Sequence, residues 1–167
     1  MSKLLALDQS SRITGWAIFE NGKLLKYGKF NAESVGPGLG ERLNYIRNTI
    51  KNIVIDNEID EVIFEDIQMQ GNVINNVQTF KALAEVIGII SELLVELKIP
   101  QSAVLASSWK SALGIRGRAR AEQKRNAQLW VEQTYAVKPT QDECDAVCIG
   151  SYKSRHAVSE EGFSWAD

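Results

Sequence analysis

Four acidic side chains stand where they could act together on one substrate. Asp8 and Glu65 each end a short apolar run, as strands that lead into a site often do. Asp142 and Asp145 lie three residues apart, so on a helix they share one face. Carboxylate oxygens with few histidines nearby favour Mg²⁺ or Mn²⁺ over zinc. Because paired ions of this kind stabilise the attacking and leaving oxygens of a phosphoryl displacement, these acids predict a divalent-metal site for that chemistry.

Each of these acids also has a simpler explanation. Asp8 could cap the serine-rich turn that follows it. Glu65 and Asp66 are alternatives for the same place in the site. Whichever of them does not enter the site would face solvent or cap the loop. Asp142 is favoured at a helix N-terminus by the helix dipole alone. Asp145 is harder to explain in this way, because it leads into an apolar run where a buried acid needs a reason.

The elements that must position these acids alternate between strand and helix patterns. Three strand-like segments open the chain, and Asn21-Gly22 between the second and third is a strong hairpin signal. Apolar residues at spacings of three and four then mark helices. We expect strands at residues 3–8, 13–20, 23–31, 60–66 and 103–106, and helices at 39–53, 80–97, 109–113, 121–133 and 140–155.

This order predicts one α/β domain over residues 1–156, with a five-stranded mixed sheet flanked by helices, and a C-terminal tail at 157–167. The polar stretch 68–76 is expected to be a loop that enters a helix. Helix caps are expected at Asn75 or Asn76, at Ser107 or Ser108, and at Thr140 with Glu143 as its capping-box partner.

Composition limits the function classes. The 167 residues are 44% hydrophobic, and 19 basic against 21 acidic residues give a net charge of −2. That sum argues against a general nucleic-acid coat and against a polybasic membrane binder. No apolar run is long enough to cross a bilayer, and Cys144, Cys148 and His156 are too few for a zinc site. We expect a soluble cytoplasmic protein with reduced thiols and no membrane partner.

The net charge conceals a basic segment. Residues 108–125 carry six cations against Glu122, a local charge of +5, whereas the remainder of the chain carries −7. A solvated charged face is the simple explanation. However, glycines interrupt the segment and lysines bracket it, which favours contact with DNA phosphates. The six cations are Lys110, Arg116, Arg118, Arg120, Lys124 and Arg125.

Several of these motifs resemble those of one nuclease family. Leu5–Ala17 resembles the opening motif of the RuvC Holliday-junction resolvases, and Val62–Met69 resembles their second acidic strand. Gln78–Ile90 is similar to the long helix that follows, and Asp142–Val147 to their terminal D-x-x-D-A helix. The four motifs occur in register over nearly the whole chain. Its compact length and divergent motifs look most like phage-encoded members, which act in the cytoplasm of a bacterial host.

The resemblance implies a ribonuclease H-like fold, a homodimer and paired nicks across a four-way DNA junction. It also implies two Mg²⁺ ions per active site, with Mn²⁺ as a substitute. The implied ligands are Asp8, Glu65, Asp142 and Asp145. Lysines that the family has near the scissile phosphate fall at Lys110 and, with a looser alignment, at Lys124, where they could stabilise developing charge.

The chain departs from the family pattern at two places. Gln9-Ser10 follows the first aspartate where the family usually has Pro-Gly, so the turn after the strand is expected to differ. Gln68 occupies the place of an aromatic residue that stacks on bases at the crossover. Gln68 remains a candidate DNA contact, and relaxed specificity for other branched DNAs is a reasonable hypothesis.

The leading hypothesis is therefore a Mg²⁺-dependent endonuclease for four-way and other branched DNA, in recombination, repair or phage DNA processing. One alternative is a branched-DNA-binding protein that has lost catalysis, which the presence of all four acids disfavours. The other is an actin-like ATPase fragment. That fold also opens with an acid-ended strand and a hairpin, but it needs a second glycine-rich phosphate loop and more chain.

Overall fold

The computed structural model describes residues 2–68 and 73–156. The tail at 157–167 and part of the predicted loop at 68–76 lie outside the described residues. The strands are β1 (Lys3–Asp8), β2 (Ile13–Glu20), β3 (Lys23–Asn31), β4 (Glu61–Glu65) and β5 (Gln101–Val104). The helices are η1 (Ala32–Val35), α1 (Leu39–Asp56), α2 (Val73–Glu96), α3 (Ala106–Ala112), α4 (Arg120–Tyr135) and α5 (Gln141–His156).

The predicted five-stranded mixed sheet is confirmed, with the order β3-β2-β1-β4-β5. β1 runs parallel to β4, which runs parallel to β5, whereas the β2–β3 hairpin is antiparallel to β1. Parallel pairing of β1 with β4 brings Asp8 and Glu65 to the same end of the sheet. Asn21 and Gly22 both have positive φ angles, as the predicted tight hairpin turn requires.

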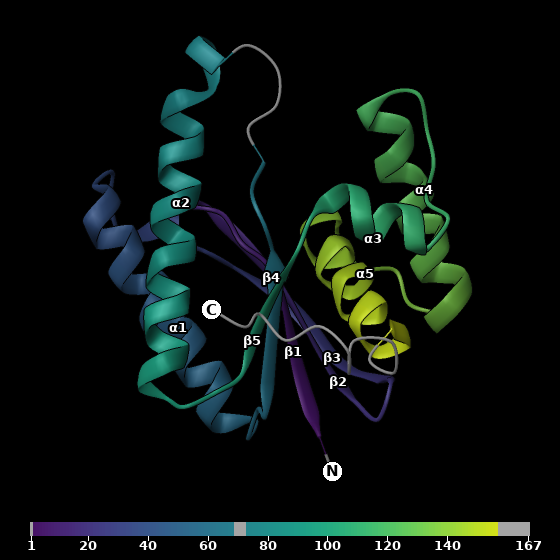
Figure 1. The fold of residues 1–167 in the computed structure, drawn as a ribbon, viewed down its shortest axis with the longest axis horizontal. Helices are drawn as coiled ribbons and strands as arrows, with labels where there is room; N and C mark the ends of the chain where they lie inside the picture. Colours follow the sequence, from purple (N-terminus) through teal and green to yellow (C-terminus); the bar gives the residue numbers. More distant parts are fainter. Residues whose placement is uncertain (1, 69–72, 157–167) are drawn as a thin grey trace, which may run out of the picture.

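Helices cover both faces of the sheet (Figure 1). α1 and α2 lie on one face, against Leu5 and Leu7 of β1. α5 lies on the other face, against Leu4 and Ala6, with α3 and α4 packed outside it. Alternate residues of β1 thus enter two separate apolar cores, which explains why this strand is an unbroken apolar run. The central strands are fixed from both sides.

The structure corrects several local predictions. β5 begins two residues earlier than expected, and α3 begins at Ala106, so Ser107 and Ser108 lie inside its first turn and do not cap it. α2 begins at Val73, so neither Asn75 nor Asn76 is its N-cap. At the start of α5 the predicted capping pair is present: the backbone N–H and the hydroxyl of Thr140 both donate to Glu143 Oε1, at 3.0 and 2.6 Å.

Both cysteines are small buried side chains. Cys144 and Cys148 are fully buried on the face of α5 that contacts the sheet, and neither forms a disulfide. No helix in the described ranges is long and apolar enough to cross a membrane.

Candidate active site

The four predicted acids come together around one cavity of about 490 Å³ at the end of the sheet. Asp8 reaches it from the end of β1 and Glu65 from the end of β4. Asp142 and Asp145 reach it from the first turns of α5, on one face of that helix. The structure therefore places the side chains as the strand ends and the helix spacing predict.

A glycine allows α5 to come close enough to β2 for this arrangement. Gly15 lies directly opposite Asp8 in the β1–β2 ladder. A Cβ atom at Gly15 would lie 1.9 Å from the backbone carbonyl oxygen of Asp142, which is much shorter than any van der Waals contact. The glycine therefore sets how closely the two acids of α5 can approach Asp8.

Burial and repulsion between carboxylates make Asp8 and Asp145 costly to ionise. Burial raises the pKa of Asp8 well above its usual value, and the nearby carboxylates of Asp145, Glu65 and Asp142 raise it further. Burial, with the charge of Glu65, raises the pKa of Asp145 to about 6. A cation bound among these groups would offset both effects, since it favours the charged form of each carboxylate.

Glu65 is held in place by two side chains, Trp109 and Gln9, that the sequence did not single out as functional. The indole N–H of Trp109, a residue that is 1% exposed, donates a hydrogen bond of 2.9 Å to Glu65 Oε2. Burial raises the pKa of Glu65, and this hydrogen bond together with Lys110 and Arg120 opposes the rise.

Gln9 holds the backbone of the same glutamate. Its side-chain amide donates to the Glu65 carbonyl at 2.5 Å and accepts from the Glu65 N–H at 3.3 Å. The amide thus continues the β1–β4 pairing by one step beyond the end of the strand. The departure from the family at Gln9-Ser10 was visible in the sequence, but its partner, 56 positions away, was not.

The turn after Asp8 is closed by Ser10. Its hydroxyl donates to the carbonyl of Ile13 at 2.7 Å and accepts from the N–H groups of Arg12 and Ile13, at 3.1 Å each. Of the two acids that end β4, Asp66 is the exposed one, and it accepts a hydrogen bond from the N–H of Ile67. Glu65 is therefore the acid that faces the cavity.

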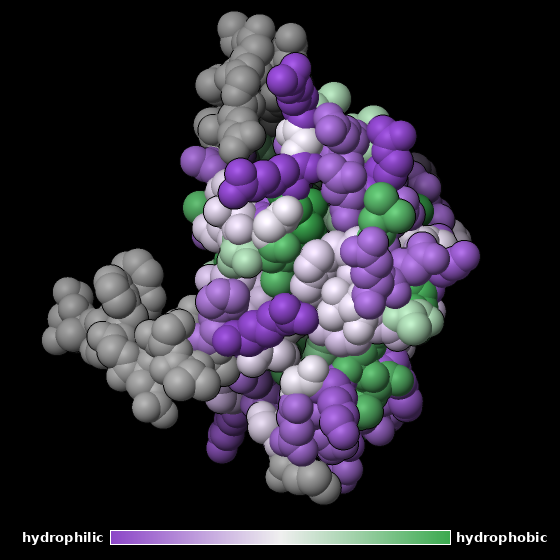
Figure 2. Space-filling view, turned by 90° about the vertical axis from the view of Figure 1, so that its right-hand side faces the viewer, coloured by the Kyte–Doolittle hydropathy of each residue, from purple (hydrophilic) through white to green (hydrophobic). Residues whose placement is uncertain are grey.

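The six cations of the basic segment divide into two groups. Lys110, Arg120 and Lys124 line the cavity with the acids. Lys110 Nζ also donates to Gln123 Oε1 at 3.3 Å. The other three lie outside the cavity on the exposed surface around α4, a face that Figure 2 shows to be largely hydrophilic with apolar patches between the polar groups. These three are Arg116, Arg118 and Arg125.

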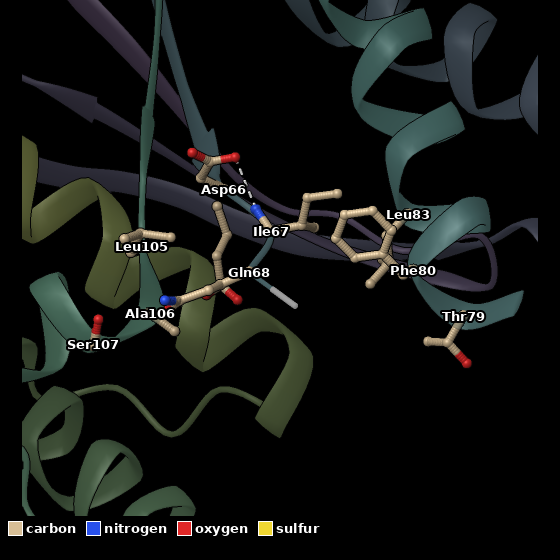
Figure 3. A pocket seen from close by; sticks show the side chains of 10 residues that line it. Asp66, Ile67, Gln68, Thr79, Phe80, Leu83, Leu105, Ala106 and Ser107 are labelled. Carbon is tan, nitrogen blue, oxygen red and sulfur yellow. Dashed lines mark hydrogen bonds between the residues drawn. The ribbon is translucent and has the colours of Figure 1, made fainter. Parts of the chain in front are cut away.

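Gln68 lines a neighbouring hollow of about 290 Å³, which shares Glu65 with the main cavity. Figure 3 shows the ring of Phe80 beside the side chain of Ile67 in this hollow. An aromatic ring is thus present near Glu65, but it comes from α2 and not from position 68.

The carboxylates line the cavity without forming a closed ligand set. In the described ranges, no three histidine, cysteine, aspartate or glutamate side chains are grouped closely enough to hold a metal ion as they stand. Their chemistry nevertheless fits a hard divalent cation. All four are oxygen donors at one cavity, and burial and repulsion make the charged state of at least Asp8 and Asp145 unfavourable until a cation neutralises it.

Comparisons with solved structures support the fold. The chain is similar to RuvC of Thermus thermophilus in complex with a Holliday junction substrate, at 15% identity and a TM-score of 0.73, with 96% of this chain and 97% of that chain covered. A second structure of Thermus thermophilus RuvC matches at 19% identity and a TM-score of 0.70, covering 94% and 96%. The Fowlpox virus resolvase, solved with Holliday junction DNA, matches at 11% identity and a TM-score of 0.64, covering 93% and 99%.

These likenesses confirm the expected ribonuclease H-like fold. A search of curated proteins gives no match. The family model described as crossover junction endodeoxyribonuclease RuvC matches residues 4–151, which includes all four acids and all of the described strands except Lys3 of β1. The chain therefore belongs to the RuvC family.

Proposed function

We propose that this protein is a divalent-metal-dependent endonuclease that binds and nicks four-way DNA junctions, and other branched DNAs as well. The observation that carries the proposal is the convergence of four carboxylates and three cations on one cavity at the end of the sheet. Membership of the RuvC family supports it, as do similar folds solved with junction DNA. Because the chain belongs to the RuvC family, we do not retain the alternative of an actin-like ATPase fragment.

Asp8, Glu65, Asp142 and Asp145 are the residues that would hold the metal, with Mg²⁺ as the expected ion, Mn²⁺ as a substitute and two ions per site. Bound there, the ions would supply a nucleophilic hydroxide and stabilise the leaving 3′-oxygen. The protein itself holds Glu65 through Trp109 and Gln9, so that this ligand needs little reordering on binding.

Lys110 and Lys124 are the proposed catalytic cations. Both line the cavity with the acids, where they can stabilise the negative charge that develops on the phosphate. Arg120 lines the same cavity and is placed to orient the scissile strand. Removing a single preorganised donor of this kind typically lowers kcat by about 10²–10³-fold.

Arg116, Arg118 and Arg125 are the proposed contacts to phosphates beyond the site, because they lie outside the cavity on the exposed surface around α4. Gln68 is a further proposed DNA contact, next to the cavity. A glutamine cannot stack on bases as an aromatic ring does, so we propose weak sequence selectivity and cleavage of flaps and forks as well as junctions.

The remaining parts of the proposal follow from the family resemblance. The enzyme would act as a homodimer whose two sites make paired nicks, in the cytoplasm, within recombination, repair or phage DNA processing. Residues 1–156 would form the single nuclease domain, with 157–167 as a tail.

The decisive experiment compares wild type with Asp8→Asn on a labelled four-way junction, in Mg²⁺ and in EDTA. We expect wild type to nick only with Mg²⁺, and the variant to bind without nicking. Asp66→Asn is the matched control, since Asp66 is exposed and outside the cavity; it should nick normally. Equal nicking by wild type and Asp8→Asn would reject the metal site. Binding by wild type without nicking in Mg²⁺ or Mn²⁺ would favour the catalytically silent alternative.

A further inference from the structure

A second groove, of about 640 Å³, shares Ser10 with the catalytic cavity. Its walls come from the β1–β2 loop, the start of α1 and one face of α2. Arg12, Arg42 and Lys81 line it, one from each of these elements, against the single acid Glu85. Three segments that are distant in sequence thus each bring one cation to the same groove.

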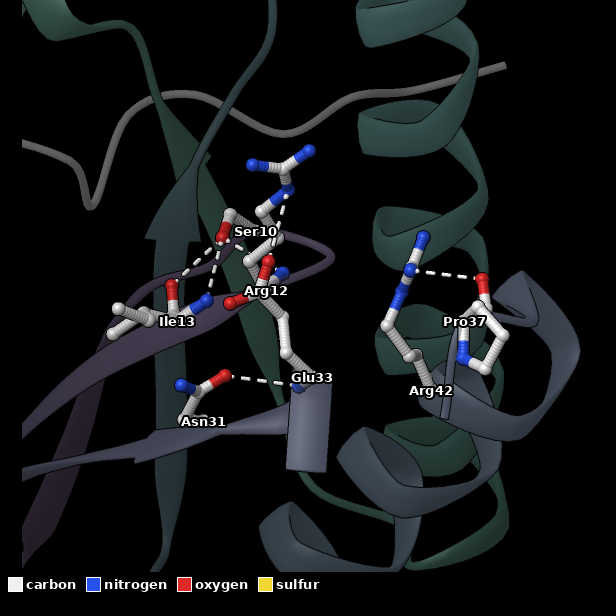
Figure 4. A network of polar contacts seen from close by, with 7 residues as sticks. All are labelled: Ser10, Arg12, Ile13, Asn31, Glu33, Pro37 and Arg42. Carbon is white, nitrogen blue, oxygen red and sulfur yellow. Dashed lines mark hydrogen bonds and ion pairs between the residues drawn. The ribbon is translucent and has the colours of Figure 1, made fainter. Parts of the chain in front are cut away.

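Arg42 has hydrogen-bonding capacity that the described protein groups do not satisfy. Its Nη1 donates to the carbonyl of Pro37 at 3.1 Å, which fixes the guanidinium at the start of α1 (Figure 4). Its Nε is buried and has no hydrogen-bond partner among the described residues. Because Nε is buried, a ligand in the groove would meet the outer N–H groups of this guanidinium, which are arranged to bind paired anionic oxygens.

Arg12 is held loosely next to the same groove. Its Nε lies 3.4 Å from Glu33 Oε1, but 73% of its side chain is exposed. Figure 4 shows the guanidinium groups of Arg12 and Arg42 extending in the same direction from their backbones. An exposed ion pair of this kind contributes little to stability, so Arg12 can exchange Glu33 for another anion at little cost.

The start of α1 adds partial positive charge. This helix has 18 residues, and its N-cap, Gly38, provides no side-chain hydrogen bond to the first N–H groups. Leu39, the first residue of the helix, lines the groove. The N–H groups of a first helical turn and the helix dipole both favour an anion at such an end, and Glu41 in this turn supplies one negative charge of the protein's own.

The groove adjoins the catalytic cavity. Ser10 lines both, and it follows Asp8 by two residues. On the opposite side of the acids, Arg120 and Lys124 line the cavity. The acids are therefore flanked by positive charge on both sides, which is the pattern expected where one polyanionic strand passes across a metal site.

We propose that this groove binds the phosphate backbone of the DNA strand on the side of the scissile bond away from α4. The inference rests on the proposed nuclease function and adds a second phosphate-binding site to it. Arg12 and Lys81 supply exposed charge, and Arg42 supplies a fixed guanidinium next to them. The strand is thereby held on both sides of the bond to be cut.

The test measures binding of a labelled four-way junction in EDTA over a range of salt concentrations. The variant Arg12→Gln/Lys81→Gln removes two groove charges. The control Lys23→Gln/Lys98→Gln removes two exposed charges at the opposite end of the sheet. Each lost phosphate contact lowers the slope of log affinity against log salt by about 0.9, so we expect the groove variant to lose up to about 1.8 and the control to match wild type.

The main outcome of a second measurement is obtained with wild type alone, so it does not depend on the folding of any variant. Neutral methylphosphonates replace single phosphates on either side of the nicked position. With wild type, we expect a methylphosphonate at one or two positions on the side away from α4 to lower junction affinity. With the groove variant, a methylphosphonate at the same positions should cause no further loss of affinity. Junction binding with an unchanged slope and no such position would overturn the groove alone. No junction binding by wild type would overturn the proposed function together with it.

Discussion

The indole N–H of Trp109 lies 2.9 Å from Glu65 Oε2 and donates a hydrogen bond to it. This contact joins a fully buried core residue to one of the four acids at the cavity. The neighbouring residue, Lys110, lies with Nζ 5.4 Å from the centre of the same indole ring and lines the cavity as well. One short helix thus positions both an acid and a cation of the proposed site.

Replacing Trp109 with Phe should weaken metal binding. The substitution leaves a buried carboxylate oxygen without its donor and raises the pKa of Glu65 further, so protons compete better with the metal. Loss of a group that orients a ligand typically costs about 10–100-fold in metal affinity or activity. The Mg²⁺ concentration for half-maximal nicking should rise accordingly, and more so at low pH. Trp130→Phe makes the same change at a half-buried position on α4 that does not line the cavity; equal Mg²⁺ midpoints in the two variants would contradict the role.

Gly15→Ala should disturb the site through the backbone. The added Cβ would overlap the Asp142 carbonyl, and neither backbone can yield without moving α5 away from the sheet. Overpacking of this kind costs about 1–3 kcal/mol or more. Thermal denaturation should show this loss, with nicking reduced at temperatures where the variant is still folded. Gly40→Ala is the control, because a Cβ there meets nothing within 4 Å. If Gly15→Ala proved as stable as Gly40→Ala, the close approach of α5 to β2 at Gly15 would have no role.

Lys110→Gln and Arg118→Gln should separate catalysis from binding. Each removes one charge from the basic segment, but only Lys110 lines the cavity. We expect Lys110→Gln to lower the single-turnover nicking rate by about 10²-fold with little change in junction affinity. Arg118→Gln should weaken junction binding and leave the rate at saturation unchanged. The prediction fails if both substitutions act on affinity alone.

Local signals in the sequence were sufficient to predict where the acids lie. Asp8 and Glu65 each end an apolar run, and parallel pairing of buried strands brings such ends together. The spacing of Asp142 and Asp145 fixes their common face on a helix. The hairpin at Asn21-Gly22 follows from the backbone conformations that these residues tolerate. In each case a short segment determines the outcome.

Contacts between distant segments could not be predicted in this way. Trp109 and Glu65 are 44 positions apart, and nothing near either residue indicates the other. Which cations face the cavity depends on how α4 is rotated. That rotation is set by the burial of Ala127 and Val131, which turns Arg120 and Lys124 toward the acids. The composition of the basic segment shows its net charge, but it does not show which of its cations line the cavity and which lie on the exposed surface.

The metal-free protein should lose stability as pH rises through the range where Asp145 ionises. Its pKa in the folded state is raised to about 6, against about 3.9 in an unfolded chain. The folded state therefore binds the proton more tightly. The stabilisation is fully present below about pH 4 and is lost as pH rises past about 6.

Compared with Asp145→Asn, wild type in EDTA should thus become less stable between pH 4.5 and 7.5. The change should be on the order of 2 kcal/mol, reduced where the carboxyl faces the open cavity and is screened. Melting temperatures of both proteins at the two pH values measure it, with Asp66→Asn as an exposed control. Mg²⁺ should restore wild type at pH 7.5 and have much less effect on Asp145→Asn, because the ion neutralises the repulsion that ionisation creates. A difference between wild type and Asp145→Asn that does not vary with pH would show that burial and repulsion do not act on this carboxyl.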